Sequence, residues 1–88
     1  MNIYDLGRRR TGNQLCKITT IKRKDVDGKQ AICFYSSYDE CEYVYPGYSI
    51  YDAVLAYEKD TRYQGFAEIS YHTNDAFIAE QFLKMPPF

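Results

Sequence analysis

The three cysteines and the single histidine are the side chains of this sequence best suited to bind a metal or to act as nucleophiles. Cys16, Cys33, Cys41 and His72 stand singly, without the Cys-x-x-Cys or His-x-x-x-His spacing that is typical of zinc sites. A Cys–His nucleophile pair would need His72 beside Cys33 or Cys41, which lie on other predicted strands. We therefore expect no bound metal, no cofactor and no catalytic residue, and a surface position for His72.

Carboxylates cluster twice, at Asp25 and Asp27 and again at Asp39, Glu40 and Glu42. Both clusters fall in or beside predicted turns, where little apolar surface is available to raise a carboxyl pKa for acid–base catalysis. The five glycines form no phosphate-binding loop. A chain of 88 residues also needs most of its side chains for one modest core. The sequence predicts a single domain over residues 1–88 that is not an enzyme.

The net charge of −1 hides an uneven distribution along the chain. Residues 1–24 contain seven basic side chains and one acidic side chain, which is a net charge of +6. Residues 25–88 contain four basic and eleven acidic side chains, which is a net charge of −7. Such asymmetry is typical of proteins that bind a charged partner or that self-associate, here as a homodimer. The alternative is that the basic segment packs on the acidic remainder of the fold.

The cellular compartment is predicted from cysteine number and from the first residues. An odd number of cysteines, and charges at Asp5, Arg8, Arg9 and Arg10 before any apolar run, argue against a secretory signal and against disulfides. The apolar runs are only a few residues long, too short to span a membrane. We expect free thiols, no membrane interaction and a cytoplasmic location.

Hydrophobic periodicity predicts an α+β fold in which a small antiparallel sheet of three to four strands carries two helices on one face. The predicted order is β-β-β-α-β-α. Residues 1–14 are predicted to be a basic, partly mobile N-terminal segment. The strands are predicted over residues 15–24, 29–36, 42–45 and 63–72, and the helices over residues 49–58 and 75–85.

Short sequence signals support three of these boundaries. The Asp27-Gly28 pair predicts a tight hairpin, because glycine adopts positive φ at no steric cost. Ser49, with Asp52 three residues later, predicts the start of the first helix. Asn74 is the predicted cap of the second helix.

Tyrosines and acidic residues gather in the middle of the sequence. No basic residue lies between Lys29 and Lys59, and a strand with a period of two cannot bury every aromatic ring of this stretch. Exposed tyrosine provides rigid contact area in interfaces, and carboxylates steer a basic partner. The alternative is that the rings form the rim of the core and the acidic groups only solvate a loop. The predicted partner-binding residues are Tyr38, Asp39, Glu40, Glu42, Tyr43, Tyr45 and Tyr48.

Basic residues suggest a second, competing surface. A basic arm and the tip of a hairpin are known ways of entering DNA grooves. Through its Gly-Arg-Arg-Arg run and the order of its predicted elements, the stretch over residues 8–58 resembles the arm-binding domains of phage-type integrases. The alternative is a lysine-rich strand edge that prevents pairing with other chains. The residues of the nucleic-acid hypothesis are Arg8, Arg9, Arg10, Lys22, Arg23 and Lys24.

Small size, the absence of catalytic motifs and an acidic, aromatic surface together resemble the phage and mobile-element proteins that inhibit host nucleases, anti-CRISPR proteins among them. That resemblance implies a non-enzymatic inhibitor that occupies a basic, nucleic-acid-binding site of a partner protein such as a nuclease complex. The sequence therefore predicts a protein-binding function, with nucleic-acid binding through the basic segment as the alternative.

Overall fold

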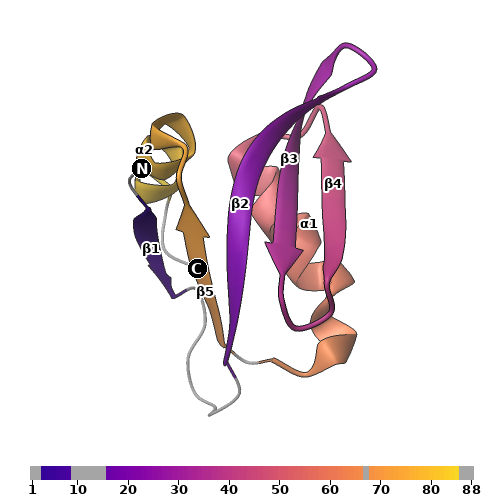
Figure 1. The fold of residues 1–88 in the computed structure, drawn as a ribbon, viewed down its shortest axis with the longest axis vertical. Helices are drawn as coiled ribbons and strands as arrows, with labels where there is room; N and C mark the ends of the chain where they lie inside the picture. Colours follow the sequence, from indigo (N-terminus) through magenta and orange to yellow (C-terminus); the bar gives the residue numbers. More distant parts are fainter. Residues whose placement is uncertain (1–2, 9–15, 67, 86–88) are drawn as a thin grey trace.

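Seven regular elements follow one another in the order β-β-β-β-α-β-α, with a short 3-10 helix before the last strand (Figure 1). The computed structural model describes residues 3–8, 16–66 and 68–85. The strands are β1 (Tyr4–Arg8), β2 (Cys16–Val26), β3 (Lys29–Ser36), β4 (Cys41–Pro46) and β5 (Glu68–Thr73). The helices are α1 (Ile50–Asp60) and α2 (Ala76–Leu83), and the 3-10 helix is η1 (Arg62–Gln64). The predicted α+β class is confirmed.

The five strands form one mixed sheet in the order β1-β5-β2-β3-β4. The prediction of three to four strands, all antiparallel, is wrong in detail, because β5 pairs parallel to β2. The reason is α1, which carries the chain back along the sheet after β4, so that β5 runs in the same direction as β4. Because β2, β3 and β4 alternate in direction, β4 and β5 both run parallel to β2.

The first strand, β1, lies within the segment predicted to be partly mobile. It pairs antiparallel with β5 and places Leu6 in the core. The register shifts between Asp5 and Arg8, where Gly7 has φ of +84° and donates its N–H to Asp5 Oδ1 at 2.9 Å. A mobile loop over the rest of the segment, and the predicted start of β2 at Leu15, lie outside the described residues.

The turn and helix caps follow local sequence signals. Asp27 and Gly28 both have positive φ, 52° and 81°, which confirms the predicted two-residue hairpin. The Ser49 hydroxyl accepts the N–H of Asp52 at 3.1 Å and caps α1 as predicted. The cap of α2 is Asp75, not the predicted Asn74.

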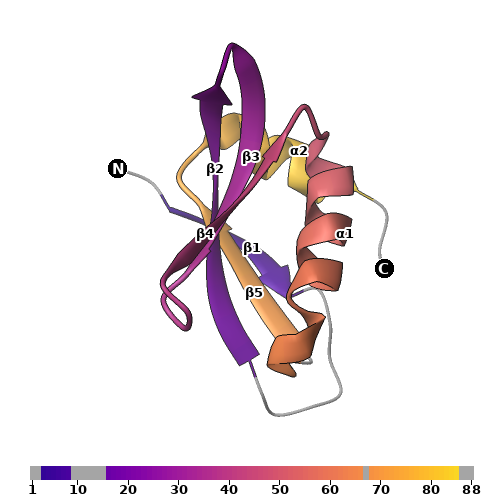
Figure 2. The same ribbon diagram turned by 90° about the vertical axis from the view of Figure 1, so that its right-hand side faces the viewer.

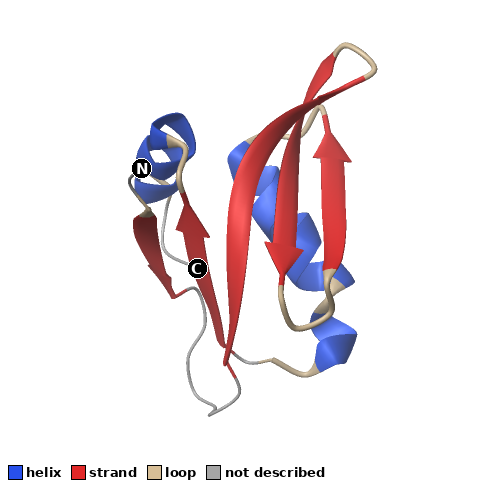
Figure 3. Ribbon diagram, viewed as in Figure 1, coloured by secondary structure: helices blue, strands red, loops and turns tan. Residues whose placement is uncertain are grey.

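Both helices pack on one face of the sheet, as predicted, and leave the other face uncovered (Figure 2). Figure 3, drawn from the uncovered side, shows α1 behind the strands. The core lies between these layers and centres on aromatic rings: Phe34 of β3 stacks on Tyr57 of α1 with the ring centroids 4.4 Å apart. Tyr71 of β5 packs edge-on to both rings.

Candidate partner-binding site

The alternation of side chains along β4 divides the predicted acidic, tyrosine-rich surface between two faces. Tyr43 and Tyr45 point toward the helices, where Tyr43 packs edge-on to Tyr57. Glu42 has the opposite orientation, since its register partner on β3 is the exposed Tyr35. The expectation that the seven predicted residues form one surface is therefore wrong for Glu42.

Tyr45 is not available to a partner, because its side chain is only 8% exposed. Its ring packs edge-on to Phe34, and its hydroxyl donates to Asp60 Oδ2 at 2.9 Å. Burial and this hydrogen bond raise the pKa of Tyr45 above the ordinary tyrosine value. The assignment of Tyr45 as a contact residue is thus corrected: Tyr45 is a core residue that holds β4 to the end of α1.

Tyr48 lies away from the other predicted residues, although it is exposed. It packs edge-on to Tyr45 and lines a cavity of about 300 Å³ between the start of α1 and α2. Tyr51 and Phe77 line the same cavity. This position is at the opposite end of α1 from η1, so Tyr48 does not share a surface with Tyr38 and Asp39.

The basic residues at the end of β2 are engaged in ion pairs with the acidic remainder of the chain. Lys22 and Lys24 lie 3.2 and 3.1 Å from the two carboxylate oxygens of Glu42. Hydrogen bonds from Lys24 and Lys22 lower the pKa of Glu42 below its ordinary value. Glu42 is therefore an ionised carboxylate whose charge is compensated by two lysines on the uncovered face of the sheet, so it is not a steering charge.

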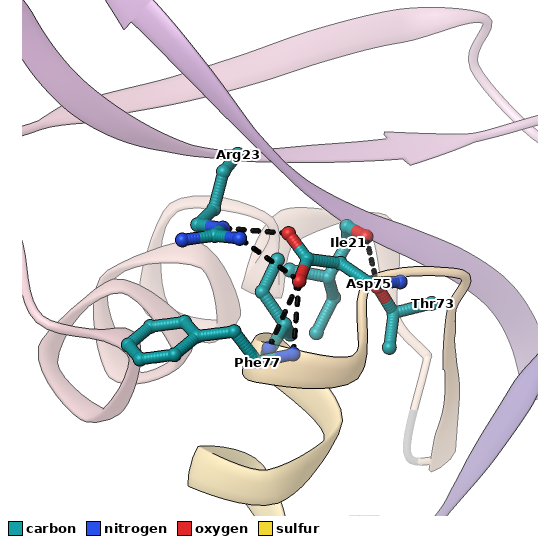
Figure 4. A network of polar contacts seen from close by, with 6 residues as sticks. Ile21, Arg23, Thr73, Asp75 and Phe77 are labelled. Carbon is teal, nitrogen blue, oxygen red and sulfur yellow. Dashed lines mark hydrogen bonds and ion pairs between the residues drawn. The ribbon is translucent and has the colours of Figure 1, made fainter.

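Arg23 lies on the helix side of β2 and binds Asp75 through two hydrogen bonds, of 2.6 and 3.1 Å (Figure 4). Its guanidinium also lies over the ring of Phe77, 4.6 Å from the centroid. The structure thus separates the predicted nucleic-acid set, with Lys22 and Lys24 on one face and Arg23 on the other. Arg8 is the last residue of β1, while Arg9 and Arg10 lie outside the described residues.

The other predicted residues lie together at one end of the molecule, where the turn after β3 is next to η1. Two tyrosines there are strongly exposed: Tyr38 at 60% and Tyr63 at 77%. Tyr38 packs edge-on to Phe66 with the centroids 4.7 Å apart. The Tyr43 hydroxyl contacts both Asp39 and Tyr63. We call this surface the tyrosine end; it consists of Tyr38, Asp39, Glu40, Tyr43, Tyr63, Gln64 and Phe66.

Hydrogen bonds hold the turn of the tyrosine end in shape. Ser36 accepts the N–H of Tyr38 at its hydroxyl and the N–H of Glu40 at its carbonyl, at 3.1 and 3.0 Å. Asp39 Oδ1 accepts the N–H of Cys41 at 3.2 Å. Glu40 has φ of +54°, a conformation that a non-glycine residue rarely adopts. These contacts present Tyr38, Asp39 and Glu40 in one defined arrangement.

A buried lysine lies beneath the tyrosine end. Lys17 is only 4% exposed, and its ammonium donates to Gln64 Oε1 at 2.6 Å. It also lies over the rings of Tyr57 and Phe66, 4.7 and 5.7 Å from their centroids. Burial lowers the pKa of Lys17, and the nearby charge of Asp39 opposes that shift. Lys17 therefore supports the site from inside without reaching its surface.

Sequence reasoning missed Tyr63, Gln64 and Phe66, because it placed them in the strand predicted over residues 63–72. That prediction is wrong at its start: Tyr63 and Gln64 belong to η1, and β5 begins only at Glu68. The available signal was Tyr63 itself, an aromatic residue flanked by Arg62 and Gln64 and followed by Gly65. A large ring in such a polar stretch is a candidate for an exposed contact. Its proximity to Asp39 depends on tertiary structure and could not be read locally.

The residues considered for metal binding and catalysis do not converge. No group of three or more His, Cys, Asp or Glu side chains in residues 3–8, 16–66 and 68–85 is arranged to bind a metal ion. His72 lies on β5 and contacts Ser70 at 3.2 Å, whereas Cys33 lies on β3 with β2 between them. Two strand spacings, about 10 Å, separate these positions. Cys41, on β4, lies one strand further away.

We expect the three thiols to differ sharply in reactivity. Cys16 and Cys41 are exposed, whereas Cys33 is fully buried, and burial raises its thiol pKa. A colorimetric disulfide reagent should therefore label two thiols rapidly in the native protein and the third only in denaturant. Rapid labelling of all three would contradict the enclosed position of Cys33. Fewer than three thiols in denaturant, without reductant, would contradict the free state of the cysteines.

Neither helix of the described chain has the length and apolar character needed to cross a membrane. Comparison of the chain with protein-family models, curated proteins and solved structures finds no match.

Proposed function

We propose that this chain is a small non-enzymatic binding protein that presents the tyrosine end to a basic site of a partner protein. The observation that carries the proposal is the combination of two exposed tyrosines with two carboxylates on a preformed turn. Among the described residues, no lysine or arginine forms an ion pair with Asp39 or Glu40. Glu40 is exposed, so its charge is available to a partner, unlike the charge of Glu42; Asp39 also accepts hydrogen bonds from Cys41, Gln64 and Tyr43.

The energetic roles of the two residue types differ. Tyrosine side chains in the centre of an interface contribute most of the affinity, because they bury large rigid area at low entropic cost. Carboxylates at the rim mainly increase the association rate and orient a basic partner. The hydrogen bonds of the turn further reduce the entropy lost on binding. An inhibitor of the anti-CRISPR type would use such a surface to occupy the nucleic-acid-binding site of a nuclease complex.

Nucleic-acid binding through the basic residues is the alternative, and the ion pairs count against it. Lys22, Arg23 and Lys24 would have to exchange Glu42 and Asp75 for phosphates. A homodimer formed through oppositely charged surfaces is weakened by the same pairs, because they already neutralise part of each charge.

The proposal is tested by capture of partner proteins from a lysate of the source cells with the purified chain as bait. We expect the double variant Tyr38→Ala, Tyr63→Ala to lose a protein that the unmodified chain retains. Loss of one tyrosine at the centre of an interface costs about 2 kcal/mol or more, roughly a 30-fold loss of affinity. Tyr35→Ala is the matched control, since Tyr35 is an exposed tyrosine on the uncovered face of the sheet.

Two further variants separate the hypotheses. Glu40→Gln should slow association and reduce its salt dependence while leaving dissociation nearly unchanged. Replacement of Arg8, Arg9 and Arg10 by alanine should leave partner capture intact. The proposal is wrong if the double tyrosine variant retains every partner. If the arginine variant alone loses function, and duplex DNA binding weakens steeply with salt, the nucleic-acid alternative is correct.

A further inference from the structure

The tyrosine end contains a chain of hydrogen bonds whose direction is determined at its buried end. The ammonium of Lys17 can only donate, so the atom of Gln64 that faces it, at 2.6 Å, must be the amide oxygen. The amide nitrogen of Gln64 then faces the other way, 2.8 Å from Asp39 Oδ2. Lys17 thus determines the orientation of the Gln64 side chain.

The direction continues outward through two hydroxyl groups. An ionised carboxylate can only accept, so the Tyr43 hydroxyl donates its proton to Asp39 Oδ2, at 3.4 Å. Either oxygen could donate in the 3.2 Å contact between Tyr43 and Tyr63; with the Tyr43 proton directed to Asp39, we assign Tyr63 as the donor. The only hydroxyl proton of Tyr63 therefore points inward.

The outward-facing group of Tyr63 is consequently an acceptor. Gln64 Nε2 lies 3.5 Å from the Tyr63 oxygen, at the limit of a hydrogen bond, which leaves this oxygen a second lone pair on a side chain that is 77% exposed. Asp39, which shares Tyr43 and Gln64 as neighbours with Tyr63, adds a carboxylate acceptor, and Glu40 adds an exposed carboxylate on the same turn. The surface thus offers acceptors to a partner, together with the faces of two exposed rings.

We propose that the tyrosine end binds an arginine side chain of the partner protein in preference to a lysine. A guanidinium is planar, carries five N–H donors and stacks on aromatic faces, so one arginine can satisfy Tyr63 and a carboxylate while lying on a ring. A lysine ammonium is a more strongly hydrated point charge with three donors. This inference rests on the proposed function, because it names the group of the basic partner that the site recognises.

The site is organised for this ligand before binding. Asp39 already accepts hydrogen bonds from Cys41, Gln64 and Tyr43, which fixes its carboxylate plane. Lys17 is a positioning residue in this arrangement, since it acts on the ligand only through Gln64 and Asp39. An arginine therefore meets oriented acceptors and does not have to order them.

The test uses two synthetic peptides of the same length and charge, Gly-Gly-Arg-Gly-Arg-Gly-Gly and its counterpart with lysine at both basic positions, each with blocked ends. Both are titrated into the ¹⁵N-labelled protein and followed by NMR. We expect the arginine peptide to bind about two- to fivefold more tightly, the size of a cation–π contact at an exposed site. Its chemical-shift changes should centre on Tyr38, Tyr63 and Gln64.

Tyr63→Phe keeps the ring and removes the acceptor, so it should reduce the preference for arginine while the protein stays folded. Tyr35→Phe is the matched control and should change the affinity for neither the arginine peptide nor the lysine peptide. Equal affinity for both peptides would overturn the arginine preference, as would shift changes confined to other surfaces. The proposed function fails separately, if partner capture does not depend on Tyr38 and Tyr63.

Discussion

Truncation of Tyr57 to alanine is expected to destabilise the fold by about 3–5 kcal/mol, the cost of removing a fully buried aromatic side chain. Tyr57 is completely buried in α1 and stacks on Phe34 with an interplanar angle of 8°. Domains of this length have a free energy of unfolding of roughly 4–13 kcal/mol, at about 0.05–0.15 kcal/mol per residue. The alanine variant should therefore lose a large fraction of its stability, measured as a lower urea midpoint by circular dichroism.

Tyr57→Phe is the matched control, because it keeps the ring and removes only the hydroxyl. That hydroxyl lies 3.2 Å from Thr19 Oγ1 inside the core, and burial raises the pKa of Tyr57 to about 12. Loss of this hydrogen bond should cost about 1 kcal/mol. If the phenylalanine variant is as unstable as the alanine variant, the hydrogen bond and not the ring contact determines the effect.

The second large effect is expected for Asp75→Ala, which should cost about 2 kcal/mol through loss of a helix cap and of charge-assisted hydrogen bonds. The Asp75 carboxylate accepts the N–H groups of Phe77 and Ile78, at 3.0 and 3.4 Å, and binds the Arg23 guanidinium (Figure 4). One side chain thus begins α2 and joins it to β2. The measurement is again the urea midpoint at neutral pH.

Asp75→Asn separates the two roles, because asparagine caps a helix nearly as well but carries no charge. Burial acts to raise the pKa of Asp75, but hydrogen bonds from Arg23 and from the Ile78 and Phe77 amides outweigh it and lower the pKa below the ordinary 3.8. The stability from the ionised form is therefore complete above about pH 4 and lost as the pH falls through the folded-state pKa.

The asparagine variant should lie between the native protein and Asp75→Ala at pH 7, and should lose less stability than the native protein on acidification to pH 3. An asparagine variant with unchanged acid sensitivity would contradict the role of the Asp75 charge. If the asparagine variant is as unstable as the alanine variant, the whole loss of stability comes from the lost ion pair with Arg23.

Local chemistry made part of this fold predictable. The Asp27-Gly28 turn and the Ser49 cap depend only on residues within a few positions of each other, and both are confirmed. The second cap was misplaced by one residue, because Asn74 and Asp75 are both good capping residues. Asp75 also binds Arg23, which lies 52 positions away in sequence, and no local pattern shows that contact.

The strand order was not accessible from the same signals. β1 has only Tyr4 and Leu6 as inward apolar residues before Gly7 breaks the register, too short a pattern to indicate a strand. The parallel pairing of β5 could have been inferred, since a helix between two strands returns the chain and lets them run in the same direction.

The candidate site was predicted in part, at Tyr38, Asp39, Glu40 and Tyr43. The rest of the site depends on which side chains of each strand face the core, and the hydrophobicity of the sequence does not show this here. On β2, Lys17 is buried and the adjacent Ile18 is 61% exposed, the reverse of what side-chain polarity predicts. A lysine that enters the fold in this way has its partner, Gln64, 47 positions away. No local pattern reveals such a contact.

The position of β5 between β1 and β2 also determines the order in which the chain can acquire its structure during synthesis. β2, β3, β4 and α1 are contiguous in sequence, and their pairings close over short loops, so they can assemble as soon as they are made. β1 is synthesised before them, but its partner among the described strands is β5, which is added more than fifty residues later. Among the described strands, β1 therefore stays unpaired while β2, β3 and β4 assemble, and it joins the sheet only after β5 has been synthesised.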